Sequence, residues 1–176
     1  CTPGIEITGI SGLKKFGIET VPAIATRAVI LDMVGLTGKK PVPEGTAFNQ
    51  PEIEAALKRQ GNMKIEKGDM VIFYTGWHTL LGVDDKRNGS VEPGLGIQGA
   101  KYLASLGVAM VGADTWALEV VPFENQGQLF HVHQILLAQN GIFILENVVA
   151  EQAVNDKVYE GLFTLGPHRT TGTVQA

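Results

Sequence analysis

The sequence has 176 residues, of which 44% are hydrophobic and 18% are charged, so the chain is too apolar to be a disordered protein. A chain of this length buries about two-thirds of its unfolded surface on folding, which is enough for one domain with a substantial core. The 14 Lys and Arg residues against 18 Asp and Glu residues give a net charge of −4, and there is no basic cluster, so we expect no nucleic-acid partner.

Apolar strands and helical patterns alternate along the first half of the chain. The apolar run Arg27–Met33 predicts a buried strand, and a Gly- and Pro-rich loop follows it. Asn49 is typical of a helix N-cap with Pro51 in the first turn and Glu52 as the capping-box acid, which predicts a helix that ends near Arg59. The run Met70–Thr75 predicts a second buried strand.

The same alternation continues in the second half. The polar segment 83–92 predicts a surface loop, and Pro93 opens a helix whose C-cap is Gly107. The remaining predicted elements are a strand at 108–113, a helix at 129–140, a strand at 142–145 and a strand at 161–165. Helices that alternate with apolar strands predict an α/β fold.

The two ends of the sequence are unusual. The chain opens on Cys1 rather than Met and stops at Ala176 without a closing element, so we expect residues 1–176 to be a piece of a longer protein. No signal peptide and no membrane-spanning apolar run is present, and a single cysteine is compatible with a reducing compartment, so we expect a cytoplasmic protein that does not bind membranes. An N-terminal Cys1 also leaves open an amidase that uses this thiol as its nucleophile.

The segment Gly94–Gly99 fits the dinucleotide-binding pattern G-x-G-x-x-G. A dinucleotide fingerprint should follow directly on a strand, so that the pyrophosphate meets the helix N-terminus. Here a polar loop and Pro93 precede the glycines, and Asp114 lies only 15 residues beyond Gly99. We therefore interpret the motif as a glycine-rich helix entry rather than as an NAD site.

The residues with the clearest chemical potential stand at the ends of predicted strands. Glu146 ends an apolar run, and a carboxylate at such a position needs a cation, a metal or several N–H donors as partners. His133 comes 13 residues earlier, and Asp114 ends the neighbouring strand in the same manner. Trp77 and Trp116 also lie just past strand ends, where open α/β sheets bind ligands. These residues predict a site, although simple packing also accounts for the tryptophans.

Four segments of the sequence are distinctive in combination: Gly68–Trp77 (GDMVIFYTGW), Glu92–Gly96 (EPGLG), Val111–Trp116 (VGADTW), and His133–Leu137 with Gly141–Asn147 (HQILL and GIFILEN). They cover much of the region between Gly12 and Arg169, and together they are more specific than any one alone. In this order they resemble the metal-dependent cyclase family, which includes kynurenine formamidases, isatin hydrolases and trans-dienelactone hydrolases.

The resemblance implies a swivelling β/β/α domain, with a mixed sheet flanked by helices, and a divalent metal, Zn²⁺ or Mn²⁺. It implies that the metal activates water for attack on an amide or ester carbonyl, often within a ring. By the resemblance Glu146 is a metal ligand, and His133 is either a metal ligand or a residue for substrate and acid–base work. Trp77, Trp116 and Gln134 are assigned to substrate binding.

One family signature is missing from the sequence. The string His-x-Gly-Thr-His-x-Asp, which supplies three metal ligands in the family, does not occur, and none of the four histidines has another histidine four residues away. In the family this string precedes the part that Gly12–Glu19 matches, so we expect it to lie upstream of Cys1. We therefore expect a single cyclase-like domain over residues 1–176 that lacks its N-terminal part and is inactive by itself.

The resulting prediction is a metal-dependent amide or ester hydrolase that acts on a small molecule. The alternative is a non-catalytic protein that uses the cyclase scaffold for binding or assembly. The resemblance also implies a homo-oligomer, at least a dimer.

Overall fold

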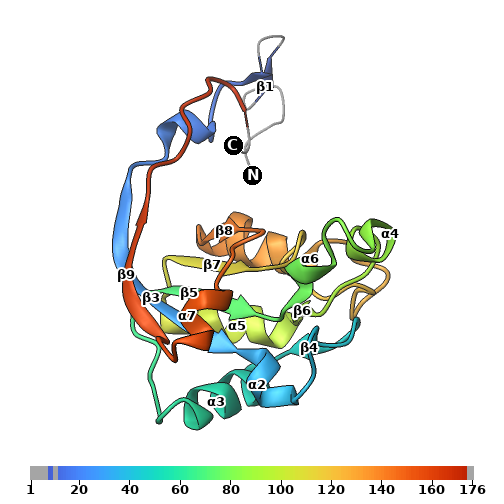
Figure 1. Cartoon of the computed structure of the whole chain (residues 1–176). Helices are drawn as coiled ribbons and strands as arrows, with labels where there is room; N and C mark the ends of the chain where they lie inside the picture. The colour runs from blue at the N-terminus through green and yellow to red at the C-terminus, as the bar shows by residue number, and fades with distance from the viewer. Residues whose placement is uncertain (1–7, 10–11, 174–176) are drawn as a thin grey trace. The chain divides into compact units, whose positions relative to one another are not determined.

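A computed structural model describes residues 8–9 and 12–173 of the chain (Figure 1). The chain divides into two compact units, of which the larger is Arg27–Gly161 and the smaller combines residues 1–26 with residues 162–176. In the smaller unit, strands β1 (Thr8–Gly9) and β2 (Gly12–Leu13) pair antiparallel, and a 3-10 turn, η1, spans Ile18–Thr20. The candidate site residues lie in the larger unit, except for Cys1, which is outside the described residues.

A mixed five-stranded sheet in the order β8-β7-β5-β3-β9 organises the fold. Its strands are β3 (Ile24–Asp32), β5 (Met70–Tyr74), β7 (Met110–Ala113), β8 (Phe143–Leu145) and β9 (Glu160–Leu165). Strands β3, β5, β7 and β8 are parallel to one another, and Met70 in β5 stands opposite Met110 in β7. Their carboxyl ends therefore share one edge of the sheet, from which Asp114 follows β7 and Glu146 follows β8.

One face of the sheet carries the main hydrophobic core. Alternate residues of β3, β5 and β7 point to this face, as the two-residue period of a strand requires: Val29, Leu31, Val71, Phe73, Val111 and Ala113. Apolar residues of the helices α2 (Met33–Thr37), α3 (Gln50–Arg59) and α5 (Ile97–Leu106) pack in the same cluster. Figure 1 shows α2 and α3 together on one side of the sheet. This is the layered α/β arrangement that the sequence predicts.

Both ends of α3 and the C-terminal end of α5 lie where their capping residues predict. In α3 the backbone N–H of Asn49 donates to the Glu52 carboxylate at 2.9 Å, and the reciprocal half of the capping box is also present. Helix α5 ends at Gly107, whose φ of 73° is the left-handed conformation that favours glycine at a C-cap. Both helices therefore follow local sequence signals as well as the demands of the core.

Three predicted elements differ from the structure. The helix expected to open at Pro93 begins at Ile97, because Gly94–Leu95 forms a strand, β6, that pairs with Ala47–Phe48. The segment expected to be a loop at 83–92 contains the short helix α4 (Asp85–Asn88), because the Asp84 side chain caps it by accepting from the backbone N–H of Arg87 at 3.1 Å. The helix expected at 129–140 begins later, since Phe130 has a left-handed φ of 52°. It is one turn of α-helix, α6 (His131–His133), followed by a π-helix, η3 (Gln134–Gln139).

Short elements complete the described chain: strands β4 (Ala47–Phe48) and β6 (Gly94–Leu95), which pair parallel, the 3-10 turn η2 (Trp77–Leu80) and helix α7 (Glu151–Asn155). None of the helices among residues 8–9 and 12–173 is long and apolar enough to span a bilayer.

The glycines of the G-x-G-x-x-G segment allow backbones to approach closely. A Cβ atom on Gly94 would lie 2.4 Å from the carbonyl oxygen of Leu118, and one on Gly99 would lie 2.3 Å from that of Phe48. The N–H groups at the start of α5 already have partners, because Ile97 N donates to Glu124 at 2.6 Å and Gly99 N donates to Asn49 at 2.9 Å. The positions that would hold a phosphate are thus filled by protein side chains.

We expect Gly99→Ala to lower the free energy of unfolding by about 1–3 kcal/mol, because the new methyl group collides with the Phe48 carbonyl. The direction of the change in the free energy of unfolding is informative. Ala is a better helix former than Gly by about 1 kcal/mol, so without the collision the substitution would stabilise α5. Urea denaturation of the two proteins measures the difference. Gly166→Ala is the matched control, because a Cβ there meets nothing within 4 Å; equal stability of Gly99→Ala and the wild type would contradict the packing argument.

Candidate metal centre

His133 is placed by an irregular stretch of helix. It ends the single turn of α6, and the π-helix η3 begins at the next residue. Single π-helical turns within helices are uncommon and are frequent at functional sites, because the extra residue per turn redirects the side chains around it. The ring of Phe130 packs edge-on against the imidazole of His133, with the ring centroids 5.3 Å apart.

Glu119 contacts His133 from a different part of the chain. Its carboxylate is almost fully buried, with a relative exposure of 3%. The backbone at this point pairs with β6, through an isolated parallel bridge between Leu95 and Glu119. Such a buried carboxylate requires polar partners on both oxygens.

Three side chains form the centre of the site. The Nδ1 atom of His133 is 2.9 Å from Oε1 of Glu119, whose Oε2 accepts from the backbone N–H of Val132 at 3.0 Å. On the other side of the ring, Nε2 of His133 is 3.4 Å from Oε1 of Glu146, which follows β8. The structure therefore brings together His133 and Glu146, as predicted, and adds Glu119 between His133 and the core.

The two carboxylates control the charge of the imidazole. Burial works against the charged form, but the hydrogen bonds and negative charges of Glu119 and Glu146 outweigh it and raise the pKa of His133 to about 9. Without a metal, His133 is therefore a cation near neutral pH and forms an ion pair with each carboxylate.

Left-handed backbone conformations flank each of the three side chains. Leu118, Phe130 and Asn147 have φ values of 58°, 52° and 56°. Leu118 directly precedes Glu119, Phe130 lies three residues before His133, and Asn147 directly follows Glu146. A residue other than glycine pays about 1 kcal/mol or more for this conformation, and such residues cluster at functional sites. Asparagine adopts this conformation readily, so the backbone is strained at Leu118 and Phe130, in the segments that carry Glu119 and His133.

The donor set fits two positions of a metal site. The neutral imidazole nitrogen and the carboxylate oxygen are both ligands that Zn²⁺ and Mn²⁺ accept. Two ligands bound at about 2.1 Å in tetrahedral geometry lie about 3.4 Å apart. The Nε2–Oε1 separation of His133 and Glu146 is 3.4 Å, a distance that also suits their ion pair. Among the residues that the structure describes, no group of three or more His, Cys, Asp or Glu side chains is arranged to hold a metal.

A second buried carboxylate shapes the turn beside the site. Glu92 is fully buried, and its two oxygens accept from the backbone N–H groups of Trp116 at 3.0 Å and Ala117 at 3.1 Å. Burial raises the pKa of Glu92 to about 8 against the effect of these donors, and the charge of Glu146 adds to the rise. Glu92 thereby fixes the start of the segment that carries Glu119.

The three predicted substrate-binding residues differ in how far they are buried and in their hydrogen-bond partners, and their role in substrate binding stays a prediction. Trp77 is fully buried, with its indole N–H bonded to the carbonyl of Asn88 at 3.3 Å. Trp116 is half-buried, and its buried indole nitrogen has no partner among the described residues. Gln134 is exposed and donates to the Leu129 carbonyl at 3.3 Å.

Asp114 belongs to a second polar network. One of its carboxylate oxygens accepts from the backbone and the hydroxyl of Thr75, at 2.9 and 2.6 Å, and the other from Gly76 N at 2.7 Å. The latter oxygen is also 3.0 Å from Nδ1 of His78, whose Nε2 is 3.2 Å from the Glu151 carboxylate. Lys40 completes the network by an ion pair with Glu151. Asp114 therefore connects the end of β5 with η2 and, through His78, with α7. The sequence groups Asp114 with His133 and Glu146, but its hydrogen bonds are made in this second network.

The sequence pattern missed three of these functional groups. Glu119 interrupts the apolar run Ala117–Val121, and the reasoning that selected Glu146 applies equally to a carboxylate at that position. Glu92 begins the EPGLG segment, but it ends a polar stretch rather than interrupting an apolar run, so its burial is not predicted. His78 is an isolated histidine in the sequence, since its partners Asp114 and Glu151 are 36 and 73 residues away.

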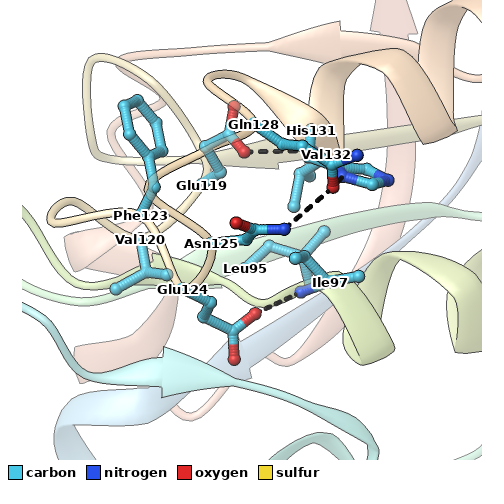
Figure 2. A pocket seen from close by; sticks show the side chains of 10 residues that line it. All are labelled: Leu95, Ile97, Glu119, Val120, Phe123, Glu124, Asn125, Gln128, His131 and Val132. Carbon is cyan, nitrogen blue, oxygen red and sulfur yellow. Dashed lines mark hydrogen bonds between the residues drawn. The ribbon is translucent and has the colours of Figure 1, made fainter.

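A small cavity adjoins the site, as Figure 2 shows. Its volume is about 10 Å³, close to the space that one water molecule needs. Glu119 and Val132 line it together with residues of the loop before α6: Phe123, Glu124, Asn125 and Gln128. The cavity is too small for an organic substrate, so it does not define a substrate pocket.

Comparison with known proteins places the chain among cyclases. A family model described as "Putative cyclase" matches residues 8–120, a range that ends before His133 and Glu146. The crystal structure of a novel cyclase is similar with a TM-score of 0.81 and 29% sequence identity, over 98% of this chain and 58% of that one. No curated protein sequence matches the chain.

Two further solved structures have the same fold. Isatin hydrolase A from Ralstonia solanacearum gives a TM-score of 0.74 at 17% identity, over 94% of this chain and 64% of that one. A potential metal-dependent hydrolase with cyclase activity gives a TM-score of 0.54 at 22% identity, over 85% of this chain and 60% of that one. The chain therefore spans less than two-thirds of the length of these proteins, and the predicted cyclase-like fold is confirmed.

We expect His78→Gln to destabilise the protein more at about pH 6 than at about pH 10. Hydrogen bonding to Asp114 raises the pKa of His78 above its ordinary value of 6.5, although burial opposes the rise. The stabilisation is therefore complete below the unfolded value and is lost as the pH rises through the folded value. At low pH the loss should be about 1.5–3 kcal/mol, the range for hydrogen bonds to charged groups.

Urea denaturation of wild type and variant at the two pH values measures this difference, and the contribution of His133 cancels because both proteins contain it. The exposed His168, whose ring contacts the hydroxyl of Thr170 rather than a carboxylate, provides the control substitution His168→Gln. A destabilisation of His78→Gln that does not change with pH would contradict a charged His78.

Proposed function

Because the chain belongs to the cyclase family, we propose that it forms part of a divalent-metal-dependent hydrolase in which His133 and Glu146 supply two of the metal ligands. The observation that carries the proposal is the 3.4 Å separation between Nε2 of His133 and Oε1 of Glu146. The left-handed Phe130, three residues before His133, supports it, since strain in a residue other than glycine or asparagine needs a compensating role. The fold likeness to hydrolases supports the reaction class.

The residues of this chain hold and orient the two ligands. Glu119 bonds to Nδ1 of His133, so that Nε2 faces Glu146. Glu146 has a side chain with a relative exposure of 30%, so it is open enough to meet an ion from solvent. Metal binding replaces the proton on Nε2, and the high pKa of His133 therefore makes binding tighter as the pH rises towards about 9.

The proposed substrate is a small molecule with an amide or ester bond, including cyclic forms. When bound, Zn²⁺ or Mn²⁺ would activate a water molecule for attack on the carbonyl carbon. Two ligands do not complete such a site, which needs three protein ligands and one open position. We propose that the missing ligands come from outside this sequence, and that Trp116, with its free indole N–H, contacts the substrate. Assembly as a homo-oligomer and a cytoplasmic location are part of the same proposal.

We expect Mn²⁺ to broaden the NMR signals of the residues around His133 and Glu146 before all others, because a paramagnetic ion acts only on nearby nuclei. The 176-residue chain should bind the ion weakly, since it provides two ligands. His133→Ala should abolish the selective broadening, whereas His131→Ala should retain it. His131 is the matched control because it lies two residues away and its ring contacts Gln128 rather than a carboxylate.

Selective broadening at another site, or broadening that survives in His133→Ala, would contradict the ligand assignment. Hydrolysis is tested with the protein as its gene encodes it, loaded with Zn²⁺ or Mn²⁺, on isatin, aryl lactones and N-formyl amides. Metal binding without any hydrolysis would favour the non-catalytic alternative, in which the scaffold serves binding or assembly.

A further inference from the structure

The two oxygens of Glu119 serve two different donors. Oε2 accepts from the backbone N–H of Val132 at 3.0 Å, and Oε1 lies 2.9 Å from Nδ1 of His133. The backbone N–H is a donor whatever the pH, so Oε2 must act as an acceptor. The contact with Val132 is buried and the contact with His133 is part-buried, so two donors or two acceptors that face each other at either position are unfavourable.

A carboxylate is the side chain that suits this arrangement, because an ionised carboxylate only accepts hydrogen bonds. Its Oε1 therefore requires a proton on Nδ1 of His133. A neutral imidazole has one protonated and one unprotonated nitrogen, so a proton held on Nδ1 leaves Nε2 with a free lone pair. Nε2 is the nitrogen that faces Glu146.

We propose that Glu119 is a positioning residue that selects the Nδ1–H tautomer of His133 and directs the lone pair of Nε2 towards Glu146. The consequence for metal binding rests on the proposed function. The tautomer itself rests on the difference between the two carboxylates: Glu119 is 2.9 Å from Nδ1 and almost fully buried, whereas Glu146 is 3.4 Å from Nε2 and its side chain, 30% exposed, can be solvated by water instead. Neighbouring residues hold Glu119 in place, since its backbone bridges to Leu95 and the left-handed Leu118 precedes it.

The isosteric variant Glu119→Gln provides a sharp test. The oxygen of the introduced amide must face the N–H of Val132. In the opposite orientation the amide NH₂ group and this N–H, both donors, would face each other. The amide NH₂ group then points at Nδ1 of His133 and requires it to be an acceptor. The variant should therefore move the imidazole proton to Nε2 and block the nitrogen that the metal would use, in the same way that an amide in place of a triad carboxylate selects the wrong histidine tautomer.

Long-range ¹H–¹⁵N correlation spectra of the full chain, recorded at a pH where the ring of His133 is neutral, assign the tautomer directly. We expect a protonated Nδ1 in the wild type and a protonated Nε2 in Glu119→Gln. The control Glu124→Gln changes a carboxylate that lines the same cavity but bonds to Ile97 N and Asn49, so it should keep the wild-type tautomer. A merely structural role for Glu119 would change stability without exchanging the two nitrogen signals.

A protonated Nε2 in the wild type would overturn the proposal, and so would a protonated Nδ1 in Glu119→Gln. The wild-type spectrum decides by itself if the variant does not fold. Mn²⁺ titration of the same samples separates the two proposals: Glu119→Gln should weaken binding at His133 by about 10–100-fold. If the spectra show the predicted tautomers but Mn²⁺ does not bind at His133, only the metal site is refuted. If Mn²⁺ binds at His133 but the tautomers are the opposite ones, only the role of Glu119 is refuted.

Discussion

The buried carboxylate of Glu119 is the constraint on which the arrangement of the site depends. A carboxylate removed from water needs donors on both oxygens, and here they come from Val132 N–H and the ring of His133. Both donors belong to the single turn of α6, so the carboxylate fixes the position of this turn as well as the orientation of the ring. The other side of the imidazole is then directed to Glu146, which emerges from the carboxyl edge of the parallel strands.

The site is assembled from the short helix α6, which carries His133, and from two loops that carry Glu119 and Glu146. Glu92 fixes the turn at Trp116 and Ala117 that leads to Glu119, while the π-helix η3 anchors the end of α6 through the buried Ile135 and Leu136. Strands β7 and β8 pair in register, which fixes the segment that ends at Glu146. The left-handed residues at these loops carry strain that the surrounding core sustains. A separate network centred on Asp114 and His78 connects η2 to α7.

Much of the fold follows from local patterns in the sequence. The continuous apolar runs of β3, β5 and β7 and the caps at Asn49 and Gly107 are short-range signals, and each marks an element that the structure contains. The proximity of His133 and Glu146 also agrees with the sequence, because His133 lies in the predicted helix that precedes the strand ending at Glu146. Glu119 carries the same local signal as Glu146, a carboxylate within an apolar run, but its contact with His133, 14 residues away across an irregular turn, follows from no periodicity. The π-helix likewise arises from packing and has no local sequence signature.

We expect Nε2 of His133 and the carboxylate of Glu146 to share a divalent ion while Glu119 retains the proton on Nδ1. Anomalous diffraction from crystals of the chain soaked in Mn²⁺ tests this most directly. An anomalous peak should lie at about 2.0–2.2 Å from both Nε2 of His133 and a carboxylate oxygen of Glu146, with the Glu119 contact intact. A peak on Nδ1, or ions bound only at other carboxylates, would contradict it.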